Sequence, residues 1–126
     1  MLKTVSTDQA PAAFGPYSQA IDTGNMLFVS GQLGIDPKTG EMPGDFDRQA
    51  KLVMQNLDAI LTQAGYSFKD VVKTTIFLDD LANFAAVNDI YGTYFTEHKP
   101  ARACFQVAGI PKGAKVEIEM IAVKSV

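Results

Sequence analysis

Charged side chains interrupt two otherwise apolar segments near the end of the chain. Residues 100–107 and 116–123 both alternate with the period of two that is typical of a half-buried strand. Arg102 lies between two alanines in the first segment, and Glu117 and Glu119 share one face of the second. We take the charged faces of these two strands as the floor of a working site.

Arg102 is the sharpest candidate. A guanidinium on a core strand is costly to desolvate unless an anion meets it. Its planar fork suits a carboxylate held by two parallel hydrogen bonds. The alternative is a structural ion pair with Glu117 or Glu119, and the residues alone leave both interpretations open.

A carboxylate near such a site could accept a proton from water or orient that water towards an electrophilic carbon. The alternation does not choose between Glu117 and Glu119 for this role. Either carboxylate could equally belong to a solvated strand face.

Three further polar side chains are weaker candidates. The Cys104 thiol would be a nucleophile only if its thiolate were stabilised, whereas its backbone N–H is a better oxyanion donor. Tyr17 could hydrogen-bond a ligand or simply pack against its loop. His98 fits the C-terminus of a helix, where it would interact with the helix dipole, and is not expected to be catalytic.

The positioning elements follow from the hydrophobic periodicity. We predict helices over residues 46–64, between an Asp45 N-cap and Gly65, and over residues 81–95, capped by Asp79 or Asp80. On the second helix Phe84 begins an apolar stripe, and Asn88 sits beside it. Strands are predicted over residues 3–7, 18–22, 26–30, 71–78, 101–107 and 116–123.

The strand over residues 26–30 is predicted to stop at Ser30 and Gly31. A glycine at such a point marks either a bulge or a close approach by another backbone or a ligand. The sequence leaves both interpretations open.

This element order predicts a single α+β domain over residues 1–126, a two-layer sandwich with a mixed sheet and both helices on one face. Several strands have apolar residues on both faces, so the uncovered sheet face needs a partner. A second copy of the chain would supply this partner without a different protein, which predicts a homo-oligomer.

Composition narrows the function classes. The net charge is −3, with no dense cluster of basic residues, which argues against nucleic acid as a partner. His98 and Cys104 are too few soft ligands for a typical zinc site. No apolar run approaches the ~20 residues of a membrane span and no secretory signal is visible. The single cysteine suits a reducing compartment, so we expect a cytoplasmic protein.

Four motifs in order make the chain resemble the Rid family, the reactive intermediate deaminases also called the YjgF family. They lie at residues 13–20, 29–32, 84–88 and 100–104, the last continued by residues 116–119. The resemblance covers nearly the whole chain. It is closest to the RidA subgroup, whose marker arginine and cysteine fall on Arg102 and Cys104.

The resemblance implies a chorismate-mutase-like homotrimer with ligand clefts between subunits. It also implies hydrolysis of 2-imino acids, such as 2-iminopropanoate and 2-iminobutanoate, to 2-keto acids and ammonia. These imines escape from pyridoxal-phosphate dehydratases, so the implied role is metabolite damage control. No cofactor or metal is implied, because an iminium carbon is already electrophilic.

Family roles carried over to this chain would place Arg102 on the substrate carboxylate and Glu117 on the attacking water, which decides between the two glutamates. The other residues of the implied cleft are the backbone of Cys104, Gly31, Tyr17, Ser30, Phe84 and Asn88. The chain departs from the family pattern at Ala103, where a hydroxyl residue is common, and in a short link over residues 98–100.

Two other functions compete with imine hydrolysis. A trimer that binds small carboxylates without turnover would need only Arg102. RNA cleavage, ascribed to some relatives, fits the acidic balance poorly.

Overall fold

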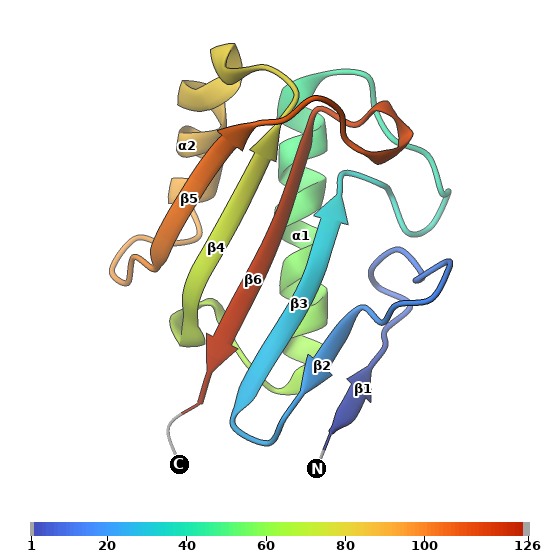
Figure 1. Cartoon of the computed structure of the whole chain (residues 1–126), viewed down its shortest axis with the longest axis vertical. Coiled ribbons are helices and arrows are strands. Elements are labelled where there is room, and N and C mark those ends of the chain that lie inside the picture. The colour runs from blue at the N-terminus through green and yellow to red at the C-terminus, as the bar shows by residue number, and fades with distance from the viewer. Residues whose placement is uncertain (1, 125–126) are drawn as a thin grey trace.

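The computed structural model of the chain describes residues 2–124, which form one six-stranded sheet covered by two α-helices (Figure 1). In chain order the elements are β1 (Lys3–Val5), β2 (Ala20–Asp22), β3 (Met26–Leu33), α1 (Phe46–Ala64), β4 (Val71–Leu78), α2 (Phe84–Gly92), β5 (Ala101–Gln106) and β6 (Val116–Val123). The predicted α+β sandwich with a mixed sheet is confirmed. Neither helix of the described residues is long and apolar enough to span a membrane.

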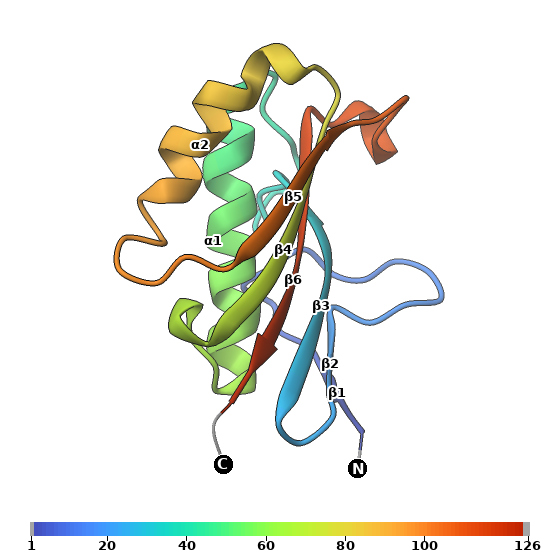
Figure 2. The same cartoon turned by 60° about the vertical axis from the view of Figure 1, so that its left-hand side comes forward.

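The strand order β1-β2-β3-β6-β4-β5 explains why both helices lie on one face. The β3–α1–β4 and β4–α2–β5 connections join parallel strands and step in the same direction along the sheet, with β6 inserted antiparallel between β3 and β4. Parallel crossovers are almost always right-handed, so two that step the same way place their helices on the same side. Figure 2 shows both helices on one side and the other sheet face uncovered.

The limits of α1 agree with the prediction from its caps. The Asp45 side chain accepts a hydrogen bond from the Arg48 amide, and Gly65 ends the helix with a left-handed φ of 81°. The buried stripe of α1, including Val53, Leu57 and Ile60, packs on the sheet and forms the core.

The second helix is shorter than predicted. Residues 81–83 form a separate 3₁₀ turn capped by Asp80, and α2 itself ends at Gly92 rather than near residue 95. Glycine is a poor helix former, and the aromatic side chains that follow it leave the helix to pack on Phe68. Asp80 therefore caps the turn, whereas the N-cap of α2 is Asn83, whose side chain makes no capping hydrogen bond, so neither Asp79 nor Asp80 caps the helix itself.

β3 is longer than predicted. It does not stop at Ser30 but continues to Leu33, across an irregularity in its pairing with β6 between Val29 and Gln32. The bulge places Ser30 and Gly31 in the middle of a long strand.

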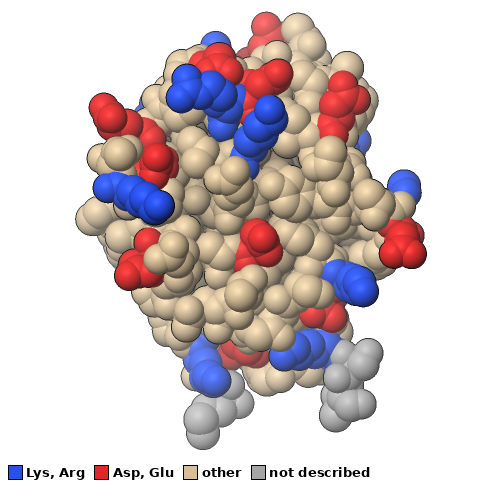
Figure 3. Space-filling model, turned by 180° about the vertical axis from the view of Figure 1, so that it is seen from behind, with Lys and Arg blue, Asp and Glu red and all other residues tan. Residues whose placement is uncertain are grey.

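The two faces of the molecule differ. Phe28 and Phe105 are 42% and 53% exposed, and both lie on the uncovered sheet face. The helix-covered side carries acidic and basic side chains interspersed, with no large area of a single sign (Figure 3). The charged helical side suits contact with solvent, and the exposed phenylalanines of the other face suit burial against a partner.

Candidate functional site

A cleft of about 700 Å³ opens on the uncovered side of the sheet. Its walls come from the loop before β2, the bulged end of β3 and the loop after it, the loop before β6, and β6 itself. We refer to this cavity as the carboxylate cleft. Four residues implied by the family resemblance line it: Tyr17, Ser30, Gly31 and Glu117.

Gly31, which has no side chain, leaves room at the floor of this cleft for the carboxylate of Glu117. A Cβ at position 31 would lie 2.6 Å from Glu117 Oε2 and 2.9 Å from Glu117 Cδ. Real Cβ atoms do not approach other atoms so closely. The glycine thus marks both a bulge and a close approach, and the approaching group is a side chain of β6.

The environment of Glu117 suits acid–base chemistry. Burial raises the pKa of this carboxyl above its usual value, and the negative charge of Glu119 raises it further. A carboxylate with a raised pKa is a stronger base than an exposed glutamate.

Arg102 lies outside the carboxylate cleft, in a cluster formed with α2. Its Nη1 donates a 2.6 Å hydrogen bond to Asn88 Oδ1, and its guanidinium carbon lies 5.5 Å and 5.2 Å from the ring centres of Phe84 and Tyr91. We refer to Arg102, Asn88, Phe84 and Tyr91 as the guanidinium cluster.

No acidic side chain pairs with Arg102. Within residues 2–124 the one salt bridge joins Arg48 to Asp45, on the surface of α1. The alternative of an internal ion pair between Arg102 and Glu117 or Glu119 is therefore wrong. Apart from the hydrogen bond to Asn88, the donors of the Arg102 fork have no protein acceptor among the described residues.

The expectation of a single charged floor shared by both strands is also wrong. Arg102 is in register with Thr74, and Thr74 is in register with Met120. Thr74 and Met120 are buried beneath the helices, so Arg102 lies on the helical face of the sheet. Glu117 lies on the opposite face of β6 from Met120, because the two are an odd number of residues apart. The carboxylate cleft and the guanidinium cluster therefore lie on opposite sides of the sheet.

Cys104 is part of the core side of the sheet. It is in register with the buried Ile76 and packs against the core, and burial raises the pKa of its thiol, although Arg102 partly opposes this. A raised pKa disfavours the thiolate nucleophile. The role of its backbone N–H stays a prediction, supported by the position of β5 at the edge of the sheet.

His98 has a structural contact. Its Nε2 lies 2.6 Å from the carbonyl oxygen of Val71, to which it donates. The predicted interaction with the end of the second helix is wrong, because α2 ends six residues earlier, at Gly92. The histidine instead ties the loop before β5 to the start of β4.

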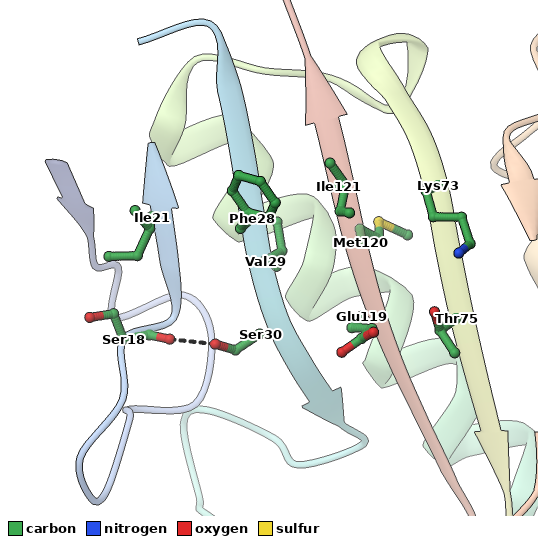
Figure 4. Close-up of a pocket in the computed structure, with 10 residues that line it drawn as sticks. All are labelled: Ser18, Ile21, Phe28, Val29, Ser30, Lys73, Thr75, Glu119, Met120 and Ile121. Atoms are coloured by element: carbon green, nitrogen blue, oxygen red, sulfur yellow. Dashed lines mark hydrogen bonds between the residues drawn. The ribbon is translucent and has the colours of Figure 1, made fainter. Parts of the chain in front are cut away.

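A second hollow of about 310 Å³ lies beside the cleft on the same face (Figure 4). Ser30 and Glu119 line both cavities. The Ser30 hydroxyl donates a 2.6 Å hydrogen bond to the Ser18 carbonyl, so it fixes the loop before β2 against β3. The figure shows the Glu119 carboxylate close to Thr75 of β4, away from Ser18.

Sequence reasoning missed two residues of the site. Tyr91 completes the guanidinium cluster, and its signal was its spacing, three residues after Asn88 and seven after Phe84 on the same helical face. Lys112 lines the carboxylate cleft. Its backbone has a left-handed φ of 62°, which is uncommon for a lysine and which no sequence pattern predicted. Within residues 2–124, no three His, Cys, Asp or Glu side chains gather as metal ligands do.

Comparison with known proteins gives consistent matches along the whole chain. Residues 7–124 match the family model described as endoribonuclease L-PSP. The chain is 51% identical to the 2-iminobutanoate/2-iminopropanoate deaminase of Escherichia coli K12, over 98% of this chain and 99% of the relative. The crystal structure of the E. coli YjgF gene product has a TM-score of 0.93 at 50% identity. That of E. coli TdcF with bound serine has a TM-score of 0.94 at 48% identity. Each comparison covers 98% of this chain and 99% of the other.

Proposed function

This chain belongs to the endoribonuclease L-PSP family, also called the Rid or YjgF family, and on that premise we propose that it is an enzyme that hydrolyses 2-imino acids. Its substrates are 2-iminopropanoate and 2-iminobutanoate, and its products are the 2-keto acids and ammonia. The observation that carries the proposal is a half-buried carboxylate of raised pKa, Glu117, on the floor of an open cleft. The 51% identity to an E. coli deaminase of these substrates supports it.

The reaction needs a group that holds the substrate carboxylate and a group that handles water. Arg102 supplies the first, because its guanidinium is held in place while most of its donors stay free. Glu117 supplies the second: it accepts a proton from water as the oxygen attacks the iminium carbon, and passes that proton to the nitrogen. The tetrahedral intermediate then collapses: its C–N bond breaks and ammonia leaves while Glu117 accepts the hydroxyl proton and the carbonyl of the keto acid forms. Glu117 returns that proton to solvent before the next turnover.

The remaining residues implied by the family surround these two groups. Gly31 gives the Glu117 carboxylate its space, and the Cys104 backbone N–H binds developing negative charge. Tyr17 and Ser30 line the same cleft as Glu117, whereas Phe84 and Asn88 hold Arg102.

One chain does not bring Arg102 and Glu117 to one substrate, because they lie on opposite sides of its sheet. We therefore propose a homotrimer in which each active site takes Glu117 from one subunit and Arg102 from its neighbour. Closed cyclic symmetry is the usual arrangement for such an assembly. The exposed Phe28 and Phe105 of the uncovered face would be buried between the copies.

The test is the rate of keto acid formation from 2-iminobutanoate generated in situ. We expect the protein to accelerate it and the Arg102→Ala variant to be inactive, while Arg48→Ala, which removes a surface arginine of α1, stays active. A wild-type protein at the buffer rate that still binds 2-oxobutanoate would instead identify a non-catalytic carboxylate-binding trimer.

The cellular role proposed for this activity is metabolite damage control in the cytoplasm. Reactive imines arise where pyridoxal-phosphate dehydratases act, so an enzyme that removes them is useful in the same compartment. The net charge of −3 and the mixed charges of the helical side do not favour nucleic acid as a partner. Absence of RNA retention at moderate salt is the expected result.

A further inference from the structure

Tyr91 spans the two neighbouring strands that carry Thr74 and Arg102. Thr74 of β4 and Arg102 of β5 are direct register partners, so their side chains leave the same face of the sheet. The Tyr91 hydroxyl shares a 2.8 Å hydrogen bond with Thr74 Oγ1. The ring of the same tyrosine lies 5.2 Å from the guanidinium carbon of Arg102. One side chain of α2 therefore contacts both members of a cross-strand pair.

The hydrogen bond to Thr74 fixes this ring. Thr74 is fully buried and Tyr91 is only 8% exposed, so neither hydroxyl can readily exchange its partner for water. Leaving a buried hydroxyl unpaired is costly, and this cost keeps the two groups together. The ring thus presents a fixed surface to the guanidinium.

We propose that Tyr91, anchored by Thr74, is a positioning residue for Arg102. The inference rests on the proposed function only in that Arg102 binds the substrate carboxylate. A free arginine side chain loses rotamer freedom when it binds, and a guanidinium held beforehand loses less. Asn88 takes one N–H of the fork, and the Phe84 and Tyr91 rings restrict its plane. The other donors remain available for two parallel hydrogen bonds to a carboxylate.

Tyr91 and Thr74 act through Arg102 rather than on the substrate. Both are buried beneath the helix layer, and their hydroxyl groups are hydrogen-bonded to each other. Removing the Tyr91 ring should therefore weaken carboxylate binding only while Arg102 is present.

The experiment is a double-mutant cycle on the affinity for the product 2-oxobutanoate, followed by NMR titration so that millimolar Kd values are measurable. We expect Tyr91→Leu to raise the Kd about five- to tenfold in the wild-type background, in keeping with the loss of a desolvated cation–π contact. In the Arg102→Gln background the same change should alter the Kd less than about twofold. Tyr94→Leu is the control, since Tyr94 packs on Phe68 rather than on Arg102.

Two smaller substitutions at Thr74 test its hydrogen bond to Tyr91 if Tyr91→Leu does not fold. Thr74→Val removes the partner of the tyrosine hydroxyl and should raise the Kd about threefold, whereas Thr74→Ser keeps the hydroxyl and should restore wild-type affinity. Equal affinity of both Thr74 variants would overturn the anchoring role.

The outcomes separate this inference from the proposed function. If Arg102→Gln binds 2-oxobutanoate as tightly as the wild type, the proposed role of Arg102 fails. If Arg102→Gln loses affinity but Tyr91→Leu loses none, or loses as much in both backgrounds, the positioning role of Tyr91 fails while that of Arg102 stands.

Discussion

Arg102 and Glu117 lie on opposite faces of the same sheet. The first projects towards α2, where Asn88 and two aromatic rings hold it, and the second projects into an open cleft beside Gly31. A chemistry that needs both groups at one substrate must therefore bring two copies of the chain together.

This separation predicts complementation between inactive variants. In the proposed homotrimer, the Arg102→Ala and Glu117→Gln variants should each be inactive, because every site lacks one group. Co-expression of the two variants in equal amounts should recover about a quarter of the wild-type activity, since a random site takes both intact groups with that frequency. Activity that stays absent in confirmed mixed trimers would show that both groups act within one chain.

The close approach of Gly31 to Glu117 predicts a large effect from one methyl group. Gly31→Ala places a Cβ 2.6 Å from Glu117 Oε2 and must displace the carboxylate. We expect kcat/KM to fall at least about tenfold, because a misplaced catalytic group loses much of its effect. Gly44→Ala is the matched control, as nothing lies within 4 Å of its Cβ and its φ is not positive. A Gly31→Ala variant with wild-type kcat would contradict the role of the Glu117 position.

The raised pKa of Glu117 predicts the acid side of the pH–rate profile. The base acts only when ionised, so activity should fall on acidification around a pKa above the ~4.3 of an ordinary glutamate. Glu119→Gln removes one cause of the raised pKa, and the acid limb should move to lower pH. The surface variant Glu97→Gln should leave the limb unchanged. A limb that does not respond to Glu119→Gln would exclude Glu117 as the titrating group.

Asn56 of α1 predicts a link between fold stability and the cleft. Its side chain is buried, and its Nδ2 donates 3.0 Å hydrogen bonds to the carbonyls of Leu33 and Ile35, which line the cleft. Asn56→Ala leaves both carbonyls unpaired and should cost about 1–3 kcal/mol of unfolding free energy, measured by denaturant titration. Gln55→Ala, at the preceding exposed position, should cost less than about 0.5 kcal/mol. An equal loss of unfolding free energy in the two variants would contradict the link between Asn56 and the cleft.

Local signals determined most of the elements. Asp45 and Gly65 marked both ends of α1, and the β-branched run of residues 71–78 marked all of β4. These features depend on neighbours in the chain, so they can be seen without a structure. The α2 end was missed because its apolar stripe continues past Gly92 into residues that pack outside the helix.

What the sequence by itself determined was the list of chemical groups and which of them share a face within one strand. Alternation fixes side-chain parity along a strand but says nothing of which face turns towards the helices. Only the tertiary structure decided that Arg102, on the edge strand β5, lies on the helical side while Glu117 lies on the open side. At an edge a long side chain can pack its stem against the core and keep its charged head at the rim, so a charge there does not mark the open face.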